Sequence, residues 1–216
     1  MKKAPTRYAA VATFAASSRS FTFAAFGAFA AALSIATGSL VGAEAPRIGA
    51  TAPDFALPGA ADGKVVNLKE LSARSKAVTV IFIATKCPVS NAYNERMAGL
   101  GKEYAAKGIA FVGINSNKTE PAAETAEHAR KQGFTFPVVK DDQNRVADLY
   151  GAQKTPEVYV VDPKGTLVYH GRIDESADDP NGVKSPDLRR ALDAILEGKP
   201  VPAAETKAFG CTIKRV

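Results

Sequence analysis

The sequence predicts a three-layer α/β/α sandwich, in which a mixed central sheet lies between helices and is preceded by an N-terminal β-hairpin. Apolar, β-branched runs at 77–84 and 109–114 are each followed by a segment of helical character, which favours parallel strand pairs. A turn signature at 162–165 then joins two further strands, which favours an antiparallel pair. The two patterns together predict a mixed sheet.

The elements before the sheet centre follow from turn and helix signals. An extended segment at 49–57 and a short strand at 65–68 flank a turn at 61–64, and this arrangement predicts the hairpin. The segment 88–107 begins with a proline, has none inside and stops before a glycine. We therefore expect one helix there, directly after the first buried strand.

The remaining elements continue the alternation of strands and helices. In the final helix, which begins near Asp187, apolar residues repeat at i, i+3, i+4 and i+7 and form one buried face. We expect further strands at 136–139, 158–161 and 167–169, and further helices at 119–132 and 143–150.

Residues 1–43 predict a secretory signal peptide or a retained N-terminal anchor. Four basic residues are followed by an uncharged, alanine-rich stretch that ends in small residues, with Ala43-Glu44-Ala45 as one possible Ala-x-Ala processing site and Val41-Gly42-Ala43 as another. Cleavage near Ala43–Ala45 is favoured because alanine dominates the stretch rather than leucine, although its length would also cross a bilayer. Both alternatives place the rest of the chain outside the cytoplasm, in the periplasm or secreted, where disulfides persist.

The net charge of +6 gives no reason to expect a nucleic-acid partner. The leader supplies four basic residues and no acidic ones, so its removal after Ala43 leaves +2. A membrane partner is expected only if the leader is retained. After it, we expect one domain at 47–198 and a C-terminal tail at 199–216 that carries Cys211.

The two cysteines of the chain are the main candidates for function. Cys87 follows the buried strand at 77–84 and precedes a helix, at the sheet edge where α/β proteins gather ligand sites. The unpaired amides of the helix start and the neighbouring Lys86 favour the charged sulfur, since such surroundings lower a thiol pKa from about 8.5 to roughly 3.5–7.5. Cys87 is therefore predicted to be an attacking thiolate rather than an inert core cysteine.

The residues around Cys87 resemble the active-site run of TlpA-type thioredoxins, in which a strand ends in Ala-Thr before a Cys-x-x-Cys; here the run is 82–90. Thr155-Pro156 matches the cis-proline of that fold, which faces the reactive cysteine and lines the groove where a partner's backbone pairs. The resemblance implies a thioredoxin-like fold, and it implies that Thr155 and Pro156 form the substrate groove.

A wider resemblance covers nearly all of the chain beyond residue 47. The start 49–55, the run 171–174 and the tail 209–214 are similar to a peroxiredoxin-like family within the redoxins of the alkyl hydroperoxide reductase and thiol-specific antioxidant type. In that family the tail commonly reads Gly-Cys-Ser-Ile-Lys. The resemblance implies redox chemistry with protein thiols or disulfides, with a thioredoxin-like electron donor as a further partner.

Two departures limit what the resemblance implies. Ser90 stands where a thioredoxin has its second cysteine, so a mixed disulfide on Cys87 cannot be resolved from within the motif; Ser90 is left as an auxiliary hydroxyl near the sulfur. True peroxiredoxins place Pro and Thr or Ser where this chain has Val80 and Ala84. Efficient peroxide reduction is therefore not expected, and a thiol peroxidase is kept as the alternative function.

Three interpretations of Cys211 remain open. It is a resolving thiol that attacks a sulfenate or mixed disulfide on Cys87, or it forms a structural disulfide with Cys87, or it bridges to a second chain. Pairing within the chain is favoured, since only two cysteines are present in an oxidising compartment. A structural bond would stabilise the fold by up to about 4–5 kcal/mol on the loop-entropy model. A cycling bond needs a mobile tail, for which the run 198–202 supplies an extended arm.

Metal and cofactor sites are not expected. His128 and His170 have no ligand spacing to either cysteine, and the acidic residues in 174–179 are interpreted as a solvated loop rather than a calcium site. The sequence therefore predicts a thiol–disulfide oxidoreductase without a cofactor. A non-catalytic redoxin-fold binding module with a locked Cys87–Cys211 bond is the alternative from a different class.

Overall fold

The computed structural model describes residues 45–216. The expected leader at 1–43, with its processing site at Ala43–Ala45, therefore lies outside the described residues except for Ala45. Within 45–216, no helix is long and apolar enough to cross a membrane.

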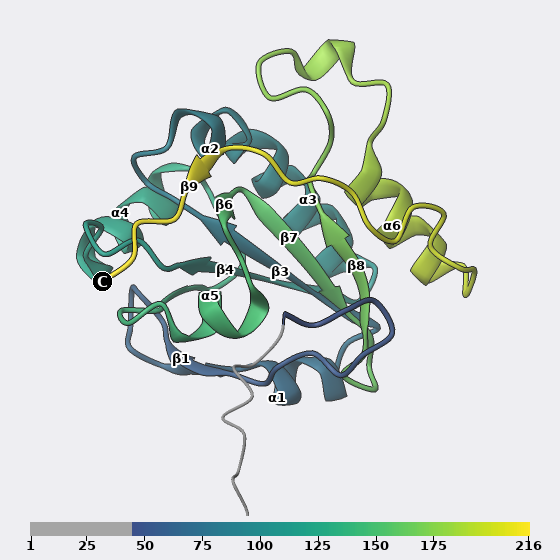
Figure 1. The fold of residues 1–216 in the computed structure, drawn as a ribbon, viewed down its shortest axis with the longest axis horizontal. Helices are drawn as coiled ribbons and strands as arrows, with labels where there is room; N and C mark the ends of the chain where they lie inside the picture. Colours follow the sequence, from purple (N-terminus) through teal and green to yellow (C-terminus); the bar gives the residue numbers. More distant parts are fainter. Residues whose placement is uncertain (1–44) are drawn as a thin grey trace, which may run out of the picture. The chain divides into compact units, whose positions relative to one another are not determined.

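A five-stranded mixed sheet forms the centre of the described fold (Figure 1). Its strand order is β5-β4-β3-β7-β8. The strands β3, β4 and β5 run parallel, whereas β7 pairs antiparallel with β3 and β8 with β7. The bounds are β3 Ala77–Ile83, β4 Ile109–Asn115, β5 Val138–Lys140, β7 Glu157–Val161 and β8 Leu167–Gly171. The mixed sheet predicted from the sequence is confirmed.

The alternation of side chains along β3 builds two separate cores. Val78, Val80 and Phe82 face one core, whereas Ile81 and Ile83 face the other, as the two-residue period of a strand requires. All seven residues of β3 are buried. A strand covered on both faces explains why its sequence is continuously apolar rather than alternating.

Helices cover both faces of the sheet, which confirms the three-layer architecture. Side chains of α3 (Asn94–Ala106) and α6 (Asp187–Leu196) fill one core. The other core is filled by α1 (Leu68–Ala73), α5 (Arg145–Tyr150) and the expected N-terminal hairpin. In that hairpin β1 (Ala56–Pro58) pairs antiparallel with β2 (Val65–Asn67). The helix α4 (Ala122–Lys131) packs against β5.

Two local expectations differ from the structure. The helix expected over 88–107 is divided into α2 (Pro88–Ala92) and α3, because the Tyr93 N–H bonds back to the Ser90 carbonyl in a tight turn. The helix α1 was not expected. Its start is fixed by Asn67, whose side chain accepts a hydrogen bond from the Glu70 N–H.

Two short strands outside the main sheet complete the fold. The strand β6 (Lys154–Thr155) precedes β7, and β9 (Cys211–Thr212) lies in the C-terminal tail. They pair antiparallel as a separate two-stranded sheet. Figure 1 shows the yellow C-terminal segment running from α6 across the sheet to β9, beside β6 and α2.

Candidate functional site: a disulfide across the groove beside a cis-proline

Cys87 lies where β3 gives way to α2. Its backbone is extended (φ −84°, ψ 118°), and the residue forms the N-cap of α2 with Pro88 in the first turn. The Ser90 N–H points at the Cys87 sulfur at 3.3 Å. A side-chain acceptor at an N-cap satisfies an amide that the helix itself leaves unpaired. The hydrogen-bond donor on this sulfur therefore comes from a residue only three positions further along the chain.

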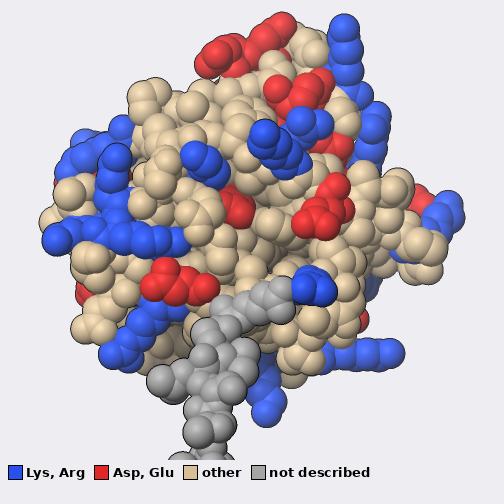
Figure 2. All heavy atoms as spheres, viewed as in Figure 1, with Lys and Arg blue, Asp and Glu red and all other residues tan. Residues whose placement is uncertain are grey.

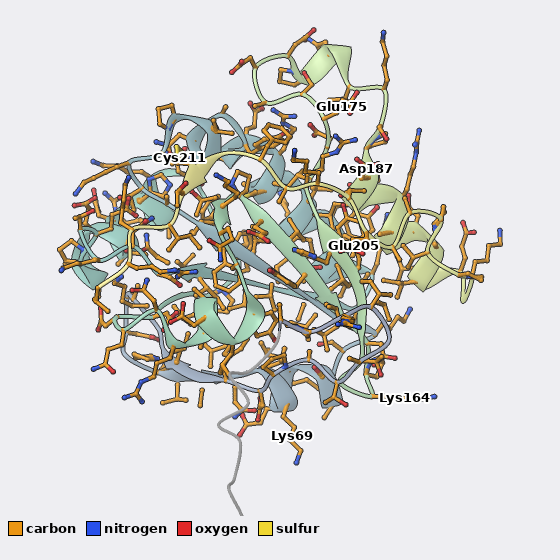
Figure 3. All side chains as sticks on the ribbon, in the orientation of Figure 1. Lys69, Lys164, Glu175, Asp187, Glu205 and Cys211 are labelled. Carbon is orange, nitrogen blue, oxygen red and sulfur yellow. A yellow bond between two sulfur atoms is a disulfide. The ribbon has the colours of Figure 1, made fainter. Side chains whose placement is uncertain are left out.

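The sulfur of Cys87 is joined to that of Cys211 by a disulfide, with the two Cα atoms 5.9 Å apart. The pairing within the chain that the sequence favoured is therefore present. The two residues differ in exposure: Cys87 is 4% exposed, whereas Cys211 is partly exposed. Figure 3 places Cys211 on the tail at its crossing of α2.

The peptide bond between Thr155 and Pro156 is cis, as the motif resemblance implied. The carbonyl oxygen of Thr155 lies 3.4 Å from the Cys87 sulfur. The cis-proline segment therefore faces the cysteine directly.

The groove beside the cis-proline is occupied by the chain's own tail. In the β6–β9 pair, Thr155 lies opposite Cys211 and Lys154 opposite Thr212. This close approach depends on Gly210, where a Cβ would lie 2.1 Å from the Thr155 oxygen. The edge that the resemblance assigns to a partner's backbone is thus paired with residues of the same molecule.

The tail is fixed on both sides of Cys211. Upstream, it runs along β8, where His170 exchanges backbone hydrogen bonds with Ala204 and Thr206. Downstream, the Ile213 side chain is buried in the core that α1 and α5 also fill. The Lys214 N–H then donates to the Asn117 side chain at 2.8 Å. The arm expected at 198–202 therefore leads into a tail that is held by contacts with β8, the core and Asn117.

Glu120 organises the turn that carries Cys87. Its carboxylate is 3% exposed and accepts the backbone N–H groups of Thr85 and Lys86 at 2.8 and 3.1 Å. It also accepts from the side chains of Asn115 and Asn117. Because Asn117 in turn holds the tail, one buried acid links the turn before Cys87 to the segment after Cys211. The only sequence signal for this part was an acid directly before Pro121, the N-cap of α4.

Glu157 holds the backbone of β6 in the same way as Glu120 holds the turn before Cys87. Its buried carboxylate accepts the N–H groups of Gln153 and Lys154 at 2.7 and 2.8 Å, and His170 donates to it at 2.8 Å. Burial by itself raises the pKa of Glu157, but the hydrogen bonds from His170 and from these amides outweigh burial and hold the pKa below its ordinary value. The charged carboxylate thereby fixes the segment that leads to the cis-proline.

The side chains of Lys86 and Ser90 contact groups other than the Cys87 sulfur. The Lys86 ammonium bonds to the Thr119 carbonyl at 3.0 Å and to Glu124 at 2.9 Å. The Ser90 hydroxyl accepts the Ala84 N–H at 3.2 Å, so this residue meets the sulfur through its backbone amide. The predicted catalytic functions, activation of the thiolate by Lys86 and an auxiliary hydroxyl from Ser90, stay predictions.

The other polar candidates lie in different surroundings. Asp174, from the acidic loop, is buried against Arg96 at 2.8 Å and accepts from the Tyr93 hydroxyl. His128 is half-buried with its ring edge on Phe134, and burial lowers its pKa. No group of three or more metal-ligating side chains occurs within 45–216.

The fold and the site together define a thioredoxin-like redoxin: a strand-to-helix cysteine faces a cis-proline on a mixed sheet. The match to the AhpC/TSA family model over residues 48–170 covers more than half of the chain, so this protein belongs to the AhpC/TSA family. Cys87 and the Thr155–Pro156 segment lie inside the matched range, whereas Cys211 lies beyond it.

The chain is also similar to individual proteins and solved structures. The chain is 32% identical over 124 residues to the thiol-disulfide oxidoreductase ResA of Oceanobacillus iheyensis, a match that covers 56% of this chain and 62% of that protein. A hypothetical protein from Sinorhizobium meliloti 1021 is 35% identical with a TM-score of 0.73, covering 80% of this chain and 97% of that one. A thioredoxin family thiol:disulfide interchange protein from Chlorobium tepidum TLS, at 24% identity and a TM-score of 0.53, covers 71% and 98% and shares the fold.

Proposed function

We propose that the protein is a redoxin-type thiol–disulfide oxidoreductase in which Cys87 and Cys211 form a reversible disulfide. The observation that carries the proposal is the position of this bond, which joins the N-cap cysteine to a strand lying in the cis-proline groove. The ResA relatives, named as thiol-disulfide oxidoreductases, support the same chemistry. The leader expected at 1–43 supports a site of action outside the cytoplasm.

In the reductive half-reaction, a partner thiolate attacks the sulfur of Cys211, which belongs to the more exposed of the two residues. A new bond forms between the partner sulfur and Cys211, and the Cys87–Cys211 bond breaks with its electron pair on Cys87. Cys87 is the better leaving group because the Ser90 N–H stabilises its negative charge. The second thiolate of the partner then displaces Cys211 and leaves the partner as a disulfide.

In the oxidative half-reaction, the Cys87 thiolate attacks a client disulfide and one client sulfur leaves as a thiolate. The Cys211 thiolate then attacks the Cys87 sulfur, which re-forms the bond within the chain and releases the second client thiolate. Cys211 thus acts as the resolving cysteine, since the residue at the usual position of that cysteine is Ser90. The client must displace β9, since both use the backbone edge of β6.

Two single variants and a disulfide-containing peptide test the proposal. Reduced wild type is expected to reduce the peptide with turnover when a dithiol is supplied. Cys211→Ser should accumulate one mixed disulfide on Cys87, and Cys87→Ser should form none in the groove, as located by peptide mapping. A bond that resists dithiols in the folded protein, with a reduction potential below about −300 mV, would favour a structural disulfide instead.

A further inference from the structure

Four lysines from four separate segments lie in or next to the lining of the cavity beside the disulfide. We call Lys86, Lys118, Lys154 and Lys214 the lysine rim. Lys86 and Lys214 line this cavity of about 170 Å³ together with both cysteines. The Lys118 N–H donates to the Lys214 carbonyl at 2.9 Å, and the Lys154 ammonium lies 3.2 Å from the Thr212 hydroxyl. The fold therefore gathers these charges around one reactive bond.

The rim has an excess of positive charge. Lys86 lies 2.9 Å from Glu124, but the other three ammonium groups have no carboxylate within 4 Å among residues 45–216. Glu120 lies underneath, although four hydrogen-bond donors surround it and it is almost fully covered. Figure 2 shows Lys and Arg side chains gathered on the left of the view, over the tail and α4.

We propose that the lysine rim is the docking surface for an acidic protein dithiol, that is, a partner whose reactive cysteine pair is flanked by Asp or Glu. This inference rests on the proposed function and names the class of partner for it. The partner's backbone and side chains must come within bonding distance of a partly covered disulfide, so its surface necessarily meets the rim. Complementary charge there raises the rate of productive encounter.

The geometry makes this charge effective. Lys86 precedes Cys87 by one position and Lys214 follows Cys211 by three, whereas Lys118 bonds to the backbone of Lys214 and Lys154 lies opposite Thr212. A partner docked at the disulfide therefore meets these charges at close range, where a screening length of about 10 Å at 0.1 M salt leaves an attraction. The Lys118 and Lys214 side chains make no hydrogen bond or ion pair among residues 45–216; only their backbones hold the tail. Their charge is therefore free to act on a partner and can be reversed without removing a contact.

Two synthetic peptides with the same Cys-Gly-Pro-Cys core test the proposal, one flanked by glutamates and the other by lysines. The second-order rate of Cys87–Cys211 reduction is measured by acid quench and mass spectrometry. Each rate is divided by the rate of the same peptide with 2-hydroxyethyl disulfide, because flanking charge also changes peptide thiol reactivity. We expect the normalised ratio of acidic to basic peptide to reach roughly 10 at low salt and to approach one at 0.5 M salt.

Charge reversal supplies the matched comparison. The double variant Lys118→Glu/Lys214→Glu should react faster with the basic peptide than with the acidic one. The double variant Lys69→Glu/Lys164→Glu should keep the wild-type ratio of the two rates. Lys69 and Lys164 are also exposed and lie far from Cys211 in Figure 3.

The outcomes separate the two proposals. Equal normalised rates for the two peptides would overturn the docking surface alone. If, in addition, phosphatidylglycerol vesicles bind the protein in a way that depends on the lysine rim, the rim is a site for anionic lipid instead of an acidic dithiol. Reduction by neither peptide would overturn the proposed function itself.

Discussion

Replacing Gly210 with alanine is expected to make the Cys87–Cys211 bond easier to reduce. Gly210 has φ +139°, a conformation that residues with a side chain rarely adopt. An added Cβ would lie 2.1 Å from the oxygen and 2.9 Å from the carbon of the Thr155 carbonyl. Both are backbone atoms, so no side-chain rotation relieves the clash.

The size of the effect follows from the contact. Since Cβ atoms approach no closer than 3.0 Å, β9 must move about 1 Å away from β6. The backbone strain costs about 1–3 kcal/mol, and weakening the β6–β9 hydrogen bonds costs about 1 kcal/mol. Only in the oxidised protein does the disulfide press β9 against β6; after reduction β9 can shift away from β6 while Ile213 and Lys214 keep the tail nearby, so the cost falls mainly on the oxidised state. A cost of about 3 kcal/mol corresponds to a reduction potential about 60 mV less negative.

The assay equilibrates the protein with dithiothreitol or glutathione redox buffers, alkylates free thiols and quantifies both forms by mass spectrometry. Gly198→Ala is the matched control in the same C-terminal region. Gly198 also has positive φ (+67°), but no atom lies within 4 Å of a Cβ added there. The control should lose about 1–2 kcal/mol of stability in both redox states and keep its potential. A Gly210→Ala potential within about 15 mV of wild type would refute the close β6–β9 approach.

Two further predictions concern buried charges. Glu157→Gln should lower the unfolding free energy by about 1–3 kcal/mol at pH 7. Because the folded pKa of Glu157 lies below its unfolded value, the charged form stabilises the fold above about pH 4.5, and this contribution is lost as the pH falls through the folded pKa. The difference in unfolding free energy between wild type and Glu157→Gln should therefore be smaller at pH 3 than at pH 7, as measured by urea titration. A difference that does not change with pH would contradict this. Arg96→Met leaves the Asp174 carboxylate buried without its ion-pair partner and should cost about 3–5 kcal/mol of unfolding free energy. Arg130→Met removes a fully exposed pair and should leave the unfolding free energy nearly unchanged. Equal losses of unfolding free energy in these two arginine variants would argue against a buried pair.

The architecture was predictable because its strongest signals are local. The two continuous apolar runs identified β3 and β4, and the Asp-Pro-Lys-Gly turn identified the β7–β8 pair. The short helix α1 was missed since six residues are too few for a period to be read. Its signal was Asn67 followed three residues later by Glu70, the spacing of an N-terminal cap.

The site was predictable where it depends on neighbouring residues or on the number of cysteines. Cys87 and the Thr155–Pro156 bond stand in local motifs, and the pairing with Cys211 followed from counting cysteines. The part of Glu120 depends on amides that lie 34 and 35 positions earlier in the chain, which no spacing rule connects. The docking of β9 on β6 involves two residues from each strand, too few to give a periodic signal.

The position of β9 couples redox state to access under the proposed function. In the oxidised protein the tail is bound to β6 both covalently and by strand pairing, so a client cannot reach the same edge. Reduction removes the covalent link but leaves the burial of Ile213 and the hydrogen bond from Lys214 to Asn117. A client strand therefore competes with a tail that is tethered nearby and already shaped for the groove. Such a competitor favours closure of the internal disulfide once a mixed disulfide has formed, because Cys211 re-enters opposite Thr155 and beside Cys87. The tail would then perform two tasks that a Cys-x-x-Cys motif cannot combine: it supplies the second thiol, and it ejects the client from the backbone edge that bound it.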